Sequence, residues 1–417
     1  MEHRQNNFSG RSLTPPKHQS KHHNRVLSHN YTQLVPATMA GTLKEKKDLD
    51  FLKSTVAAVS ALIAQLEAAV KTPYTPAAPA KDNINALTLA HDAAKLIKAH
   101  STKLSLLIIN APFTPTAVTK VLSELGSSAL PALASAIEVC DSKTYTKIAS
   151  SELLYRVQKV LSEFRTLLKI VPLDGKVLTP DQKNGPTGVS ANGSLAQTGV
   201  VWQACDSLMD LQVQGIAGLV VKKAEQYRDT LKDAIEELHE WAEEESDDED
   251  DEDDEGDVAI DEGHRKSAQE EIDDMFGESA HISKSDPEKI RPRLVQSERK
   301  LKMMVLLYNA AIKRRFRSLP PLPSPSTTEP AAGVIEPITS NPAERIDAII
   351  FSLQQIPDAA DELANAFYQL DSEGIDEAMK ECWGAGMAAA KLLRDGWNAG
   401  EDEFTAWAGK FKLEMEK

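Results

Sequence analysis

The sequence has few aromatic residues, few cysteines and no surplus of positive charge. Aromatic residues make up 5% of the 417 residues against 41% for hydrophobic residues, so a core would be mainly aliphatic and rich in helix formers. The formal net charge is −16, which argues against a general nucleic-acid binder because phosphate affinity depends on cations. Three widely separated cysteines without a CxxC spacing predict reduced, buried thiols in a cytosolic or nuclear protein.

Motifs of the common catalytic classes are missing as well. There is no GxxxxGK[ST] or GxGxxG phosphate loop, no HExxH and no GxSxG. No run approaches 18 consecutive apolar residues, and the N-terminus lacks the apolar stretch of a secretory signal, so we expect no membrane span. The sequence therefore favours a binding protein over an enzyme, without a cofactor or a metal.

What the sequence does contain is helical periodicity. The first ordered helix is predicted by a heptad seam of Leu49, Leu52, Val56, Val59, Ile63, Leu66 and Val70. A helix with such a seam has to pack on other helices. Thr42 and Glu45 have capping-box spacing, which predicts the helix start there. Similar seams follow along the chain, and no segment alternates with period two, so the prediction is an all-α fold of two antiparallel helical bundles.

Prolines and glycines divide these seams into separate helices. Pro357 is predicted to end one helix, so that Leu363 and Phe367 belong to the next. A long helix is expected from about Leu195 to Trp241, weakened locally at Gly215.

Charge and composition give the domain boundaries. We predict a disordered tail over residues 1–41, a bundle over 42–242, a disordered acidic linker over 243–284 and a second bundle over 285–417. In the linker, residues 243–255 hold twelve acids in thirteen positions, and such like-charge density opposes folding. By contrast, residues 289–317 carry a net charge of +9.

Short motifs supply the candidate site residues. Lys313, Arg314, Arg315 and Arg317 resemble a nuclear import signal, or form the polar side of a helix. Arg317, Leu319, Pro320 and Pro323 fit two docking patterns: +xxPxxP for an SH3 domain, and R-x-L for a cyclin. Phosphorylation is predicted at Ser246, Thr14 and Ser324. A plain linker remains the alternative for the proline-rich stretch.

Several stretches together resemble the cyclin-D-interacting protein family. They are the seam at Phe51–Val70, SELLYRVQKVLSEFRTLLKIV at Ser151–Val171, GVVWQACDSLMDLQVQGIAGLVV at Gly199–Val221, the acidic insert, and MMVLLYNAAIKRRF at Met303–Phe316. The resemblance implies two bundles similar to the vinculin and talin rod class. It also implies a regulator, present in nucleus and cytoplasm, that binds cyclin D and helix-loop-helix transcription factors.

Two other functions stay open at this level. The same bundle type occurs in vinculin/talin-like cytoskeletal adaptors, and fold alone does not separate the two classes. The acidic run also suits a chaperone of basic proteins. The first hypothesis remains a non-enzymatic regulator that binds cell-cycle and transcription factors through its bundle faces, without direct contact to nucleic acid or membrane.

Overall fold

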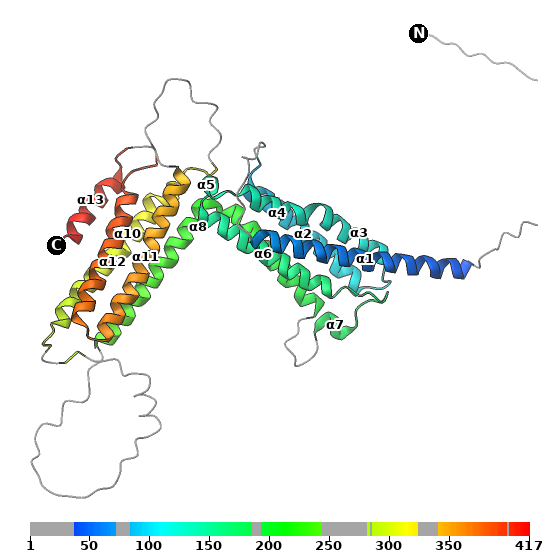
Figure 1. Ribbon diagram of the computed structural model, residues 1–417, viewed down its shortest axis with the longest axis horizontal. Coiled ribbons are helices and arrows are strands. Elements are labelled where there is room, and N and C mark those ends of the chain that lie inside the picture. The colour runs from blue at the N-terminus through cyan, green and yellow to red at the C-terminus, as the bar shows by residue number, and fades with distance from the viewer. Residues whose placement is uncertain are drawn as a thin grey trace, which may run out of the picture. The chain divides into compact units, whose positions relative to one another are not determined.

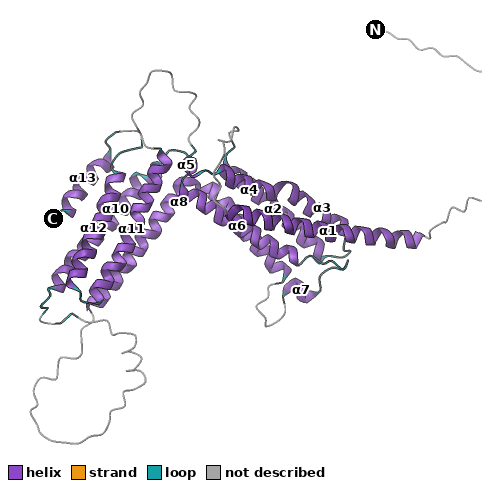
Figure 2. Cartoon of the chain, in the orientation of Figure 1, coloured by secondary structure: helices purple, strands orange, loops and turns teal. Residues whose placement is uncertain are grey.

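Helices form all the regular structure in the described part of the chain. The computed structural model describes residues 37–71, 84–185, 193–243, 282–283, 286–323, 341–397 and 400–417, except for the side chains of residues 37–42, 70 and 71. Within these ranges no residue lies in a strand, and Figure 2 shows helices joined by loops. The predicted all-α class is confirmed.

The elements follow one another as long helices and short turns (Figure 1). In chain order they are α1 Ala37–Lys71, α2 Ala86–Ile109, α3 Pro115–Glu124, the π-helical turn η1 Leu125–Ala129, α4 Leu130–Val139, α5 Ser142–Tyr145, α6 Lys147–Lys169, α7 Pro180–Asn184, α8 Ser194–Glu243, α10 Ile290–Arg314, the 3-10 turn η3 Phe316–Ser318, α11 Pro342–Tyr368, α12 Ser372–Leu393 and α13 Glu403–Met415.

A first group of helices is arranged around α2. It packs against α6 and the first half of α8, while α3, η1 and α4 cover another side of it. Helix α1 adds the predicted seam: Leu52, Val59 and Ile63 are buried, and Leu49, Val56 and Leu66 pack against the core while partly exposed. The helix begins at Ala37, before the predicted start at Thr42.

Helix α1 keeps a long apolar surface in contact with solvent. By length and composition alone, Leu43–Ala69 is apolar enough to cross a membrane, with a mean hydropathy of 1.4 and 17% of its most apolar window buried. A helix of a soluble bundle gives the same signal, so the expectation that the chain has no membrane span stays a prediction.

A second group consists of the second half of α8 together with α10, α11 and α12. Helices α11 and α12 form the most extensive pair, and α13 packs on α10 and α12. Aromatic contacts fix the far end of α8: the Trp241 ring lies 5.3 Å from Tyr368 in an edge-on arrangement. Because α8 packs in both groups, its second half packs with α10 and α11 although it lies inside the predicted first bundle, 42–242. The two-bundle division stays a prediction.

The change of direction within α8 occurs at Gly215. Its backbone has a φ of 63° and a ψ of −177°, a conformation that side-chain-bearing residues rarely adopt. The local weakening predicted at this glycine is therefore a kink, and both halves of α8 remain helical on either side of it.

Pro357 lies inside α11 and does not end it, so the predicted helix break at this position is wrong. A proline inside a helix leaves the carbonyl four residues earlier without its usual N–H donor. That carbonyl belongs to Leu353, and it accepts a hydrogen bond from the buried hydroxyl of Tyr308 on α10. Packing against α10 thus replaces the missing backbone bond, and Leu363 and Phe367 belong to the same helix.

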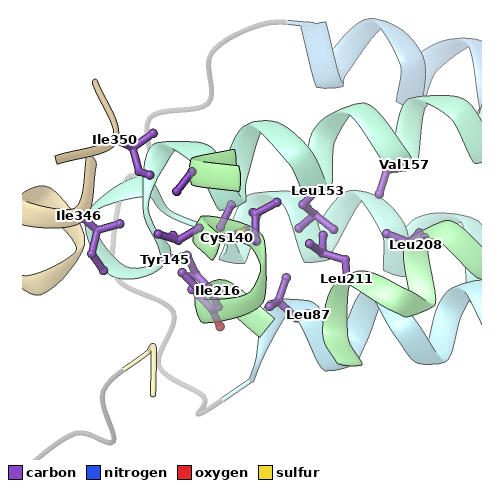
Figure 3. Close-up of a cluster of buried hydrophobic side chains, with 14 of the residues drawn as sticks. Leu87, Cys140, Tyr145, Leu153, Val157, Leu208, Leu211, Ile216, Ile346 and Ile350 are labelled. Atoms are coloured by element: carbon purple, nitrogen blue, oxygen red, sulfur yellow. The ribbon is translucent and has the colours of Figure 1, made fainter. Parts of the chain in front are cut away.

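The buried side chains of residues 47–417 form one continuous cluster. Figure 3 shows the part of it where Ile346 and Ile350 of α11 are close to Tyr145 and Ile216. All three cysteines lie in this core without disulfides, and burial raises the pKa of the Cys140, Cys205 and Cys382 thiols to about 12. The prediction of buried thiols is confirmed.

Candidate protein-interaction sites

The predicted import cluster is divided between surface and core. Lys313 and Arg317 are exposed and Arg314 is half-buried, whereas Arg315 is only 1% exposed. The helical spacing explains this, since Arg315 follows Ile312 by three positions and both side chains point inward. A receptor therefore has access to three of the four predicted cations, and the import function stays a prediction.

Arg315 instead joins the end of α10 to the α12–α13 turn. Its guanidinium donates two hydrogen bonds to the Asp402 carboxylate, at 2.5 and 2.8 Å, and others to the carbonyls of Leu393 and Arg394. The Phe404 ring lies 4.5 Å from it. The bidentate contact with Arg315 holds the pKa of Asp402 well below its usual range. This arginine is thus part of the fold.

The docking residues follow directly after this helix. Arg317 is exposed, Pro320 and Pro323 are partly exposed, and Leu319 packs against the core. An R-x-L contact would need the Leu319 side chain to leave that position, whereas an SH3 contact at the two prolines would not. Ser324, Ser246 and Thr14 lie outside the described residues, as does the acidic run.

Half of the ten cations in the +9 segment form ion pairs, four of them with acids from elsewhere in the chain. Arg293 pairs with Asp376 at 2.9 Å, Arg299 with Glu414 at 3.5 Å, Arg314 with Glu403 at 3.7 Å, and Arg315 with Asp402. Lys302 pairs within α10. The other five cations have no ion pair among the described residues, so about half of the segment's positive charge remains open to an anionic partner.

A hollow of about 580 Å³, the junction hollow, lies where α6, α8 and α11 meet. Its lining combines apolar, aromatic and charged side chains: Lys147, Ile148, Ser151, Lys223, Tyr227, Glu344, Asp347, Ala348, Ile350, Phe351 and Gln354. A hollow of this size is in the range of small-ligand sites and accommodates one or two anchoring side chains of a partner.

Asp347 fixes the position of α11 beside α6. Its carboxylate accepts hydrogen bonds from the backbone N–H of Lys147, at 2.8 and 2.9 Å, and from that of Ile148. These amides are unsatisfied donors of the first helical turn, where a carboxylate is favourable. Burial nevertheless dominates and raises the pKa of Asp347. The neighbouring Asn341 side chain donates to the Lys143 carbonyl.

The cap of α6 lies at the same place. Thr146 accepts a hydrogen bond from Ala149 N at 3.1 Å, and its φ of 100° is unusual for a threonine. The contacts from α11 thus hold a strained N-terminus in place.

The rim of the junction hollow is suited to contact with a protein. Phe351 is 65% exposed, and Tyr155, one turn of α6 beyond Ser151, is also 65% exposed. Neither Lys147 nor Lys223 has an ion pair among the described residues. Exposed aromatic side chains are typical of protein interfaces, and the two lysines can pair with acids of a partner.

Sequence reasoning missed this hollow because its residues come from three distant segments. One signal was present: Tyr155 and Phe351 are large aromatics outside the apolar seams of their helices. For metals, the described residues contain no group of three histidine, cysteine or acidic side chains placed to hold an ion.

Comparison with known proteins shows that the middle of the chain is similar to one family. Residues 90–244 match the family model described as "Grap2 and cyclin-D-interacting, N-terminal". The match covers less than half of the chain and supports assignment to that family. The range covers α2 to α8, including the α6 and α8 residues of the junction hollow, and the resemblance found in the sequence is confirmed.

A relative occurs in fission yeast. An uncharacterized protein of Schizosaccharomyces pombe is 27% identical over 158 residues, which is 38% of this chain and 44% of that protein. The chain thus aligns with less than half of that relative, and the likeness supports the family without adding an activity.

Proposed function

We propose that this protein is a non-enzymatic regulator that binds cell-cycle proteins, D-type cyclins first among them, through the junction hollow. The observation that carries the proposal is that five lining residues of the hollow lie within the segment shared with the cyclin-D-interacting family. Helix-loop-helix transcription factors are the second partner class that the family resemblance suggests, and nucleus and cytoplasm are the expected compartments.

The side chains at the rim of the junction hollow are suited to binding a protein. Phe351 and Tyr155 supply apolar area with few rotatable bonds, which reduces the entropy lost on binding. Lys147 and Lys223 favour acidic groups on the partner, and the hollow between them takes an apolar anchor.

The test is calorimetric titration of the full chain with a purified D-type cyclin. Phe351→Asp and Lys223→Glu are each expected to weaken binding by about tenfold or more, because they place a negative charge at an aromatic anchor or reverse a rim charge. The control is Leu413→Asp on α13, which changes a residue of matched exposure (63%) far along the chain and should leave affinity unchanged.

Absence of binding at about 100 μM cyclin, or equal affinity of the wild type and Phe351→Asp, would contradict the proposal. Arg317→Ala in the same series tests the R-x-L alternative without disturbing the core, since this side chain is exposed. Binding of actin but not of cyclins in the same titrations would favour the cytoskeletal adaptor.

A further inference from the structure

A second hollow, separate from the junction hollow, lies between α8 and α10. We call it the α8–α10 groove; its volume is about 250 Å³, and it is lined by Lys232, Ile235, Glu236, His239, Lys302 and Val305. Polar contacts close it at both ends. Arg228 donates to Asn309 at 3.2 Å on one side, and a His239 ring nitrogen lies 2.9 Å from Glu298 on the other.

The α8–α10 groove has an apolar floor that continues onto the exposed side of α10. Ile235 and Val305 pack against the core from the floor. Val295 and Leu306, which are large and exposed, lie seven residues before and four residues after Lys302, so helical spacing places all three on one stripe. An apolar surface with lysines at its rim suits an amphipathic helix that carries acids beside its apolar face.

The chain carries such a segment in the connection that starts at the end of α8 and ends at the start of α10. Residues 268–278 read AQEEIDDMFGE. Ile272, Met275 and Phe276 have the i, i+3, i+4 spacing of one helical face, and Gly277 follows as a helix-ending residue. Five acids surround them. These residues lie outside the described ranges.

The length of chain between this segment and α10 allows the segment to reach the groove. Lys302 lies twelve residues into α10 from Ile290, about 18 Å along the helix. The chain is already anchored at Ile282, whose carbonyl accepts a hydrogen bond from Arg291 at the start of α10. The six residue steps from Phe276 to Ile282 can span about 20 Å when extended. Tethering also raises the effective concentration to about the millimolar range, so a weak contact suffices.

We propose that residues 268–278 dock as an amphipathic helix in the α8–α10 groove. Ile272, Met275 and Phe276 cover the floor at Ile235 and Val305. The acids beside them pair with Lys232 and Lys302, whose acidic partners in the structure, Asp229 and Glu298, lie only three or four residues away on the same helix. The groove is thereby occupied by the chain's own linker.

Site-specific photo-crosslinking in the full chain tests the contact. A benzophenone amino acid at position 276 should crosslink to peptides of α8 around residues 228–239 or of α10 around 298–309. The matched control carries the probe at position 260, where Ile260 lacks apolar neighbours at helical spacing, and its crosslinks should be scattered.

Leu306→Glu should abolish the specific crosslink, because it adds a negative charge beside the acids of the segment. Leu106→Glu on α2, also at an exposed leucine, should not. High salt should lower the yield.

Hydrogen exchange gives a second readout that does not depend on the probe. Residues 268–278 should exchange at least about tenfold more slowly in the wild type than in Ile272→Asp/Phe276→Asp, a variant that leaves all groove residues intact. Equal exchange in the two proteins, a position-276 crosslink outside α8 and α10, or a crosslink to a second copy of the chain would each overturn the proposal.

Discussion

The Lys313–Arg317 run shows how one residue can have a role that its neighbours do not share. The five positions form a charge cluster in sequence, yet Arg315 is buried and donates hydrogen bonds to the end of α12 and to the turn before α13. The only sequence signal for the burial of Arg315 was its position on the helix, three residues after Ile312 and next to Phe316. A buried guanidinium is tolerated because a carboxylate and two carbonyls satisfy it.

We predict that Asp402→Asn destabilises the protein by about 3 kcal/mol, because it removes the charge partner of a buried arginine. The value is at the lower end for such pairs, since the Asp402 carboxylate is 43% exposed. Urea unfolding at pH 7 measures it. Asp395→Asn, in the exposed pair with Arg394 at 3.2 Å, is the control and should change the free energy of unfolding by less than about 0.5 kcal/mol.

The same pair predicts a pH dependence. Because the pKa of Asp402 is lowered in the folded state, its contribution is fully present above the unfolded value, about 4, and is lost as the pH falls. Asp402→Asn should therefore flatten the decline in stability below pH 4. An unchanged acid profile would show that the pair contributes nothing.

At the scale of the helix, Pro357 illustrates where sequence reasoning fails. The rule that proline ends a helix counts the lost backbone bond, but it does not count a donor from another helix. Tyr308 is 45 residues away from Leu353 in sequence, and nothing local indicates that its hydroxyl reaches the Leu353 carbonyl.

Tyr308→Phe should cost about 1–3 kcal/mol, because it leaves a buried carbonyl without a donor. In a Pro357→Ala background the backbone N–H gained at position 357 can supply that bond, so the cost of Tyr308→Phe should fall by about 1 kcal/mol. Urea unfolding of the four proteins in this cycle measures the coupling. Identical costs in both backgrounds would show that the hydroxyl does not replace the proline's missing donor.

The elements that sequence predicted well are those set by local periodicity. The α1 seam and the long α8 with its weak point at Gly215 follow from spacing and glycine. The junction hollow could not be predicted, because Asp347 caps α6 from 200 residues away and Ile350 joins a core made by other helices. Such contacts depend on tertiary packing, which no local pattern encodes.

At the scale of the whole molecule, the central fact is that α8 packs in both helical groups. The buried cluster also continues from Tyr145 and Ile216 to Ile346 without a gap. Charge and composition predicted two bundles, and the shared helix and shared core favour their joint unfolding. Independent domains would each keep their own core.

The buried cysteines supply built-in probes for this question. Cys140 and Cys205 report on the helices around α2, and Cys382 on α12. We predict that pulsed thiol labelling in urea at pH 8, read by mass spectrometry, gives the same midpoint at all three sites, within about 0.3 M, because opening one group exposes α8 in the other. Unfolded thiols react quickly at this pH, so protection reports burial. A Cys382 midpoint well apart from the other two would instead establish two independently stable bundles.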